Sequence, residues 1–135
     1  SMNKITIGKL GETHAENFLI AQHYKIIKKN FYTRFGEIDI VARIKGELRF
    51  IEVKTVSRDL TLKVIHETKK SERGEYRPED NIHPFKLRNL YKTIELYLMS
   101  KHVSPETKWQ LDIVTVLLDI EHKIAKVNLI ENIII

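Results

Sequence analysis

Two short segments in which apolar and charged residues alternate constrain the fold of this chain more than any other feature. They are Gly36-Glu-Ile-Asp-Ile-Val41 and Phe50-Ile-Glu-Val-Lys-Thr55. Alternation with a period of two is typical of strands that bury one face. Gly46 lies between the segments and favours a tight turn. The two segments therefore predict a β-hairpin.

The same residues predict the register of the hairpin. We place the turn at Lys45-Gly46, so that Asp39 faces Glu52. Two residues further from the turn, Glu37 faces Lys54. A shift by one residue would set Asp39 opposite an apolar residue and mix the two faces, which a buried sheet resists. The predicted register thus places two carboxylates side by side.

An opposed pair of carboxylates requires a compensating charge. Directly opposed side chains have Cβ atoms about 5 Å apart, where like charges destabilise a sheet. Apolar neighbours screen this repulsion poorly, so we expect one carboxyl to have a raised pKa. A divalent cation removes the repulsion, and Mg²⁺ or Mn²⁺ prefers oxygen ligands. The pair therefore predicts a site for one of these metals.

Lys54 adds an ammonium to the predicted site, since it lies on the same strand face as Glu52. Two acids, a divalent cation and an ammonium can activate water for attack on a phosphodiester. The alternative is a salt-bridged polar face, in which Lys54 only neutralises Glu37 or Glu52. The six histidines show no paired spacing typical of metal ligands.

Asp39 followed by Glu52-Val-Lys54 resembles the core motif of the PD-(D/E)XK nucleases, which is shared with restriction endonucleases and archaeal Holliday-junction resolvases. From Gly8 to about Leu118, an ordered series of motifs resembles the YraN family of small, endonuclease-like bacterial proteins. These motifs are Gly8-Lys-Leu-Gly11-Glu12 with Ala15, Tyr24-Lys-Ile-Ile27 with Asn30, Gly36-Glu-Ile-Asp39, Phe50-Ile-Glu-Val-Lys54 and Leu111-Asp-Ile-Val114.

The resemblance implies an α/β fold with a restriction-endonuclease-like core, in which helices flank a mixed central β-sheet. It also implies that Asp39, Glu52 and the Val53 carbonyl hold Mg²⁺ or Mn²⁺, with Lys54 as a catalytic residue. Glu12 would be an additional catalytic acid that approaches from a helix, against the alternative of a solvated carboxylate. Glu37 either supports the site or pairs with Lys54.

The remainder of the chain predicts further helices and strands. We expect a helix over residues 6–22 with Thr6 as N-cap, an edge strand over 24–33, a helix from Pro84 to about Ser100, and strands over 109–118 and 123–130. Residues 56–82 are polar and are expected to be irregular. Their basic residues would either contact the phosphates of a nucleic acid or belong to a solvated loop. These are Lys69, Lys70, Arg73 and Arg77.

Length and composition favour one endonuclease-like domain over residues 1–135, with Ser1 as a cloning remnant. A formal charge of +5 favours a polyanionic partner. The absence of cysteine excludes disulfides and is compatible with the cytoplasm. No apolar segment is long enough to span a membrane or to act as a signal peptide.

The resulting hypothesis is a metal-dependent endonuclease that hydrolyses DNA phosphodiesters, with branched or structured DNA among the candidate substrates. A homodimer would suit an enzyme that cuts two strands. Two alternatives remain: a non-catalytic nucleic-acid-binding module that retains the nuclease fold, and an accessory subunit that is active only in a larger assembly. Asp112 opens a strand where the resembling family has Arg-Phe-Asp, but here Gln110 and Leu111 precede it, so a phosphate-binding role does not carry over.

Overall fold

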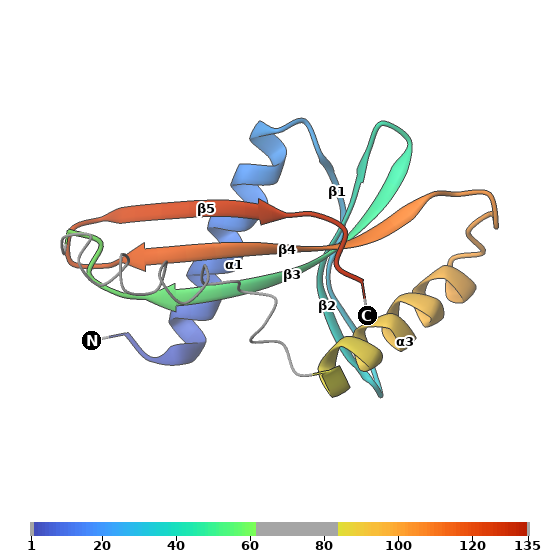
Figure 1. Ribbon diagram of the computed structural model, residues 1–135, viewed down its shortest axis with the longest axis horizontal. Helices are drawn as coiled ribbons and strands as arrows, with labels where there is room; N and C mark the ends of the chain where they lie inside the picture. The colour runs from blue at the N-terminus through green and yellow to red at the C-terminus, as the bar shows by residue number, and fades with distance from the viewer. Residues whose placement is uncertain (1, 62–83, 135) are drawn as a thin grey trace.

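The computed structural model describes residues 2–61 and 84–134 and contains one five-stranded sheet (Figure 1). In chain order the elements are α1 (Lys4–Ala21), β1 (Lys25–Thr33), β2 (Gly36–Ile44), β3 (Glu47–Ser57), α3 (Pro84–Ser100), β4 (Trp109–Asp119) and β5 (Ile124–Ile130). The strands lie in the sheet in the order in which they follow along the chain. Strands β3 and β4 are parallel, and the other neighbours are antiparallel. The predicted α/β fold with a mixed sheet is confirmed.

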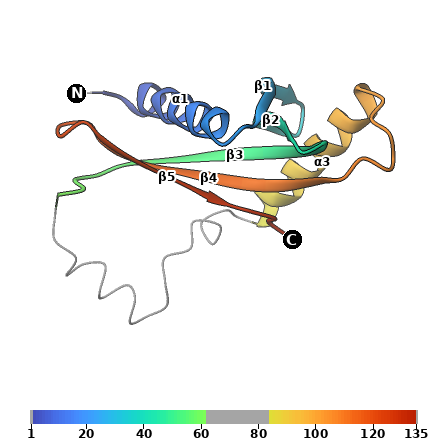
Figure 2. The same cartoon turned by 90° about the horizontal axis from the view of Figure 1, so that it is seen from above.

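Each face of the sheet carries an apolar core under one helix. Helix α1 packs Ala15 and Leu19 against one face, and helix α3 packs Leu90, Ile94 and Tyr97 against the other. Figure 2 shows α1 along one side of β3 and β4, with α3 at the other end of these strands. Strand β4 serves both cores because successive side chains of a strand point to opposite faces. Neither of the two described helices is both long and apolar enough to cross a membrane.

The β2–β3 hairpin has the predicted register over its turn-proximal half. Ile44 pairs with Glu47 and Ile40 pairs with Ile51. Lys45 and Gly46 both have positive φ, at 50° and 78°, as a two-residue type I′ turn requires. The backbone ladder ends at the pair Ile40–Ile51. The predicted register is therefore wrong beyond this point, because the two strands separate there.

Two element boundaries also differ from the prediction. Helix α1 begins at Lys4 with Asn3 as its N-cap, whose side chain accepts a hydrogen bond of 2.9 Å from the Thr6 N–H. Thr6 is thus inside the helix rather than its cap. Strand β3 continues to Ser57, because its parallel partner β4 extends as far as Leu118. The four basic residues assigned to nucleic-acid contacts lie outside the described residues.

Helix α1 approaches β3 very closely at Gly11. A Cβ built on Gly11 would overlap Thr55 Oγ1 and would lie only 2.7 Å from Thr55 Cβ. Real Cβ atoms almost never approach another heavy atom this closely. Only glycine permits the contact, and it sets the distance between the sheet and the helix turn that carries Glu12.

Candidate active site

The candidate active site lies where β2 and β3 separate. Beyond the last ladder pair, the Asp39 side chain replaces a backbone partner: its Oδ2 accepts a hydrogen bond of 2.7 Å from the Val53 N–H. Glu52 precedes Val53 and points to the face covered by α3. Asp39 is 7% exposed and Glu52 is 5% exposed. The two predicted acids are thus adjacent and almost fully buried.

Burial and mutual contact raise the pKa of Asp39 to about 9. Removal from water is the largest cause, followed by the hydrogen bond and the charge of Glu52. The Val53 N–H opposes this shift because it stabilises the ionised carboxylate. The Asp39 carboxyl therefore keeps its proton at neutral pH, with the Glu52 carboxyl beside it. The raised pKa expected from the sequence is confirmed.

A cation that the sequence analysis missed reaches the acid pair from α3. The Lys86 Nζ lies 2.5 Å from Oε2 of Glu52. Burial alone would lower the pKa of this ammonium, but Glu52, Asp39 and Glu37 raise it above its usual value. Lys86 follows Glu52 by more than thirty residues, and only the packing of α3 on the sheet brings the two together. No spacing in the sequence could have indicated this pair.

Two further acids are joined to the site by one asparagine. The Asn30 Nδ2 donates to Glu37 Oε2 at 3.0 Å and to Glu12 Oε1 at 3.3 Å. Asn30 has a φ of 54° within β1, and asparagine tolerates this left-handed conformation better than most residues. The Glu12 charge contributes to the raised pKa of Asp39. Glu12 of helix α1 therefore lies close enough for its charge to act on Asp39, and its expected role as a catalytic acid stays a prediction.

The expected pair between Glu37 and Lys54 is not formed. Glu37 pairs with Tyr32 of β1 in the sheet and bonds to Asn30, because the β2–β3 ladder has already ended. Lys54 is half-buried on the strand face of Glu52. Within residues 2–61 and 84–134 the Lys54 ammonium has no hydrogen bond or ion pair, so it does not serve to neutralise Glu37 or Glu52 there.

The acid pair has a donor set that fits a divalent cation. Oε2 of Glu52 is buried and accepts no well-aligned hydrogen bond from the described residues, although the Lys86 ammonium is close to it. Asp39 offers further carboxylate oxygens beside it. Carboxylate oxygens in this number suit Mg²⁺ or Mn²⁺. At this site, Asp39 and Glu52 would hold such an ion, with the Val53 carbonyl as a third candidate.

Asp112 lies apart from this site and has a structural role. Its Oδ1 accepts hydrogen bonds of 2.8 Å from the Asn132 N–H and from the Gln110 side chain. Its Oδ2 lies 3.8 Å from the Arg49 Nε without a well-formed hydrogen bond. These contacts fasten the segment after β5 to the start of β4. No phosphate-binding role follows from them.

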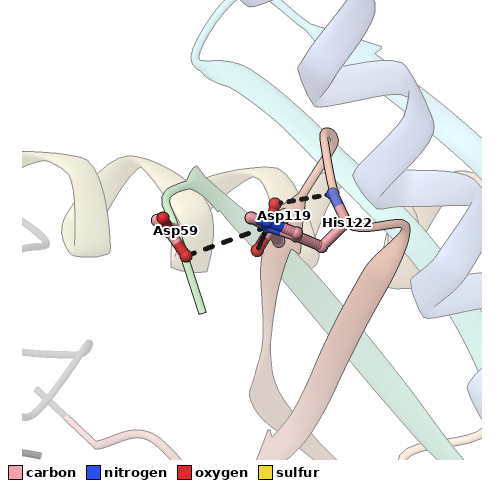
Figure 3. Close-up of side chains that lie close together, drawn as sticks. All are labelled: Asp59, Asp119 and His122. Carbon is pink, nitrogen blue, oxygen red and sulfur yellow. Dashed lines mark hydrogen bonds and ion pairs between the residues drawn. The ribbon is translucent and has the colours of Figure 1, made fainter. Parts of the chain in front are cut away.

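A second group of metal-ligating residue types lies at the other end of β4 (Figure 3). One ligand atom each of Asp59, Asp119 and His122 lies within 4.8 Å of the others. Asp119 is buried and is already well satisfied, because it accepts hydrogen bonds from the Leu60 N–H, the His122 N–H and the His122 Nδ1. The cluster therefore fastens the segment after β3 to the β4–β5 turn. The sequence analysis missed this cluster, although the spacing Asp119-x-x-His122 across a turn could have indicated it.

This cluster makes stability depend on pH through His122. Its hydrogen bond to Asp119 raises the pKa of the imidazole above the usual value of 6.5. The contribution to stability is therefore complete below about pH 6.5 and is lost as the pH rises through the higher, folded-state pKa. We expect His122→Gln to lower the melting temperature more in mildly acidic than in alkaline buffer. A loss that is equal in both buffers would contradict the assignment.

Comparison with known proteins gives a consistent family. A family model described as "Uncharacterised protein family UPF0102" matches residues 11–116. A UPF0102 protein of Campylobacter jejuni is 34% identical over 113 residues, which cover 84% of this chain and 85% of the relative. One from Caldicellulosiruptor bescii is 31% identical over 132 residues, covering 97% and 98%. Among solved structures, Pyrococcus furiosus SfsA in complex with Ca²⁺ gives a TM-score of 0.39 at 12% identity, over 96% of this chain and 64% of that chain.

Proposed function

The chain belongs to the UPF0102 family, and we propose that it is a metal-dependent nuclease that hydrolyses phosphodiester bonds in DNA. One observation carries the proposal. Asp39 and Glu52 lie side by side and are more than nine-tenths buried, and this setting raises the pKa of Asp39 to about 9. Two buried acids lower the stability of a fold unless a cation that is buried equally well pairs with them. Such an arrangement is typical of a functional site.

The proposed roles follow from the positions of the side chains. Asp39 and Glu52 hold Mg²⁺ or Mn²⁺, and the Val53 N–H fixes the Asp39 carboxylate through its hydrogen bond of 2.7 Å. The chemistry that such an ion supplies is Lewis acidity, which lowers the pKa of a nearby water and offsets charge on the phosphate. Lys54 orients the attacking water or stabilises the phosphate, because its ammonium is not engaged by the described acids.

Glu12 and Glu37 complete the proposed site as a further pair of acids. The Asn30 amide holds both, which keeps their charges near Asp39 despite their mutual repulsion. Either acid can accept a proton from water at this position. The substrate is DNA, with branched or structured DNA as the finer proposal, and the protein acts alone or as a homodimer in the cytoplasm.

Lys86 serves as the counterion of Glu52 when no metal is bound. Lys86→Met is therefore expected to tighten Mn²⁺ binding several-fold in a calorimetric titration, since the ammonium competes with the metal for Oε2 of Glu52. Lys92→Met is the matched control: it removes the same charge from α3, but its ammonium lies over the Phe35 ring, 5.2 Å from the centroid. Weaker Mn²⁺ binding by Lys86→Met would mean that Lys86 instead assembles the site.

The experiment that tests the proposed function compares wild type and Glu52→Gln, purified identically, on labelled single-stranded, duplex, flap and four-way-junction DNA. Glutamine preserves the size of the side chain but removes the charge that would hold the metal. We expect cleavage by wild type that requires Mg²⁺ or Mn²⁺ and is lost in the variant, with DNA binding retained. Equal cleavage by both proteins would reveal a contaminant. DNA binding without cleavage by wild type would favour the non-catalytic binding module instead.

A further inference from the structure

Beside the acid pair, a cavity of about 520 Å³ lies between the first half of α1 and strand β1. Its lining residues are Lys4, Ile5, Gly8, Lys9, Glu12, Thr13, Lys29, Asn30, Tyr32 and Glu37. We call it the α1–β1 groove. Its acidic residues, Glu12 and Glu37, are those that Asn30 joins to the site. The groove therefore reaches the two outer acids of the proposed site, although Asp39 and Glu52 do not line it.

Three lysines make the outer part of this groove basic. Lys29 forms an ion pair of 3.0 Å with Glu16. Lys4 and Lys9 have no carboxylate partner among the described residues. Both are exposed on the helix face that lines the groove. Free ammonium groups in this position can neutralise the phosphates of a polynucleotide backbone.

An exposed aromatic ring stands beside these charges. The Tyr32 side chain is 72% exposed, although a ring of this size normally finds apolar cover. Its hydroxyl lies near the Glu37 carboxylate, which raises the pKa of the phenol, and both residues line the groove. An exposed ring next to a lysine-lined surface is a platform on which an unpaired base can stack.

Gly8 is the independent observation that points to a ligand. A glycine inside a helix costs about 0.5–1 kcal/mol relative to alanine. Gly11, one turn later, repays this cost through its close contact with Thr55, but a Cβ on Gly8 would meet nothing within 4 Å. The described fold thus gives no reason for the missing side chain. Glycine also permits a ligand to approach the helix backbone closely.

From these features we infer that the α1–β1 groove binds one unpaired strand of nucleic acid and leads it to the acid pair. The groove has the volume of a small-ligand site, which holds a nucleotide or two but excludes a duplex. Lys4 and Lys9 contact the backbone, Gly8 lets it lie against α1, and Tyr32 stacks on a base. This inference rests on the proposed nuclease function and specifies its substrate: DNA with single-stranded character next to the cleaved bond.

Fluorescence anisotropy with a labelled oligothymidine and with a blunt duplex, in the presence of EDTA, tests binding without cleavage. We expect wild type to prefer the single strand. Gly8→Ala should raise the melting temperature and yet weaken single-strand binding several-fold. Tyr32→Ala should weaken it about tenfold, while Tyr32→Phe, which keeps the ring, should recover most of this loss. Lys126→Ala, an exposed lysine on β5 at the opposite edge of the sheet, is the control for loss of charge.

The inference is overturned if Gly8→Ala is more stable but binds the single strand unchanged, or if the groove variants weaken duplex binding as much as single-strand binding. Cleavage is measured separately on the same proteins. If wild type cuts no DNA but the groove variants lose single-strand binding, the groove assignment holds and the nuclease proposal fails. If wild type cuts and the groove variants cut and bind equally well, the nuclease proposal holds and the groove assignment fails.

Discussion

Asp39→Asn is expected to make the metal-free protein more stable at neutral and alkaline pH. In the wild type, folding holds a proton on Asp39 with a pKa of about 9. The unfolded carboxyl releases its proton near pH 4. Between these values the folded state binds more protons than the unfolded state, so stability falls as the pH rises, by up to ~1.4 kcal/mol per pH unit. Asparagine does not titrate, so the variant does not lose stability in this way as the pH rises.

The measurement is urea unfolding of wild type and Asp39→Asn in EDTA, from about pH 5 to about pH 8. Because other groups also titrate, the informative quantity is the difference between the two unfolding free energies. We expect this difference to grow by about 2–4 kcal/mol over the range, in favour of the variant. Glu95→Gln, which removes an exposed carboxylate from α3, is the control for the loss of a carboxylate away from the acid pair.

Mn²⁺ should reverse the order of the two proteins. A metal that binds only the folded state stabilises it by a free energy that rises with the logarithm of the metal concentration, once this exceeds the dissociation constant. Asparagine removes one of the two ionised ligands, so only the wild type should gain stability. A variant that is less stable than wild type at every pH without metal would show that the acid pair is structural, through the bond from Asp39 to the Val53 N–H.

The sequence predicted the acid pair because alternation and a two-residue turn fix local geometry. Asp39 and Glu52 lie on the two strands of a hairpin. Gly46 determines the position of its turn, and the turn determines the register. The predicted ladder failed from Asp39 outward, where the Asp39 side chain bonds to the Val53 N–H. Two residues further out, Glu37 and Lys54 do not pair. Where β2 and β3 separate depends on what packs against each of them. Helix α1 packs against β3, whereas β2 stays paired with β1. The alternation of apolar and charged residues within a strand does not show which neighbouring element that strand will follow.

Lys86 shows the second limit of prediction from sequence. Its contact with Glu52 depends on where α3 lies on the sheet, which is decided by the packing of Leu90 and Ile94 rather than by any motif. Asn30 is an intermediate case. Its place in a motif was visible, but its role requires the positive φ that turns its amide toward Glu12 and Glu37.

Gly11→Ala is expected to destabilise the protein by about 2–3 kcal/mol, even though alanine is the better helix former. The new Cβ would overlap Thr55 Oγ1 and lie 2.6 Å from Thr55 Cγ2. Rotation of Thr55 does not relieve the clash, because its own Cβ is only 2.7 Å away. The helix must therefore move away from β3, which opens the core beneath Ala15 and Leu19.

Gly8→Ala is the matched control for this prediction, since it makes the same substitution three residues earlier in the same helix. It gains the same helix propensity without a clash, so we expect it to stabilise by about 0.5–1 kcal/mol. Thermal and urea unfolding of both variants measure the difference. Thr55→Gly removes the overlapping atoms, and in a double-mutant cycle it should recover much of the loss caused by Gly11→Ala.

The same displacement should reach the candidate site through Glu12, the next residue of the helix. The Glu12 carboxylate is held to Asn30 by a single hydrogen bond of 3.3 Å, which a small outward movement of α1 would break. Folded Gly11→Ala should therefore lose part of the negative charge that raises the pKa of Asp39. Its unfolding free energy should then decline less steeply with pH than that of wild type. An unchanged slope in a destabilised Gly11→Ala would mean that α1 sets the stability of the fold but not the position of Glu12.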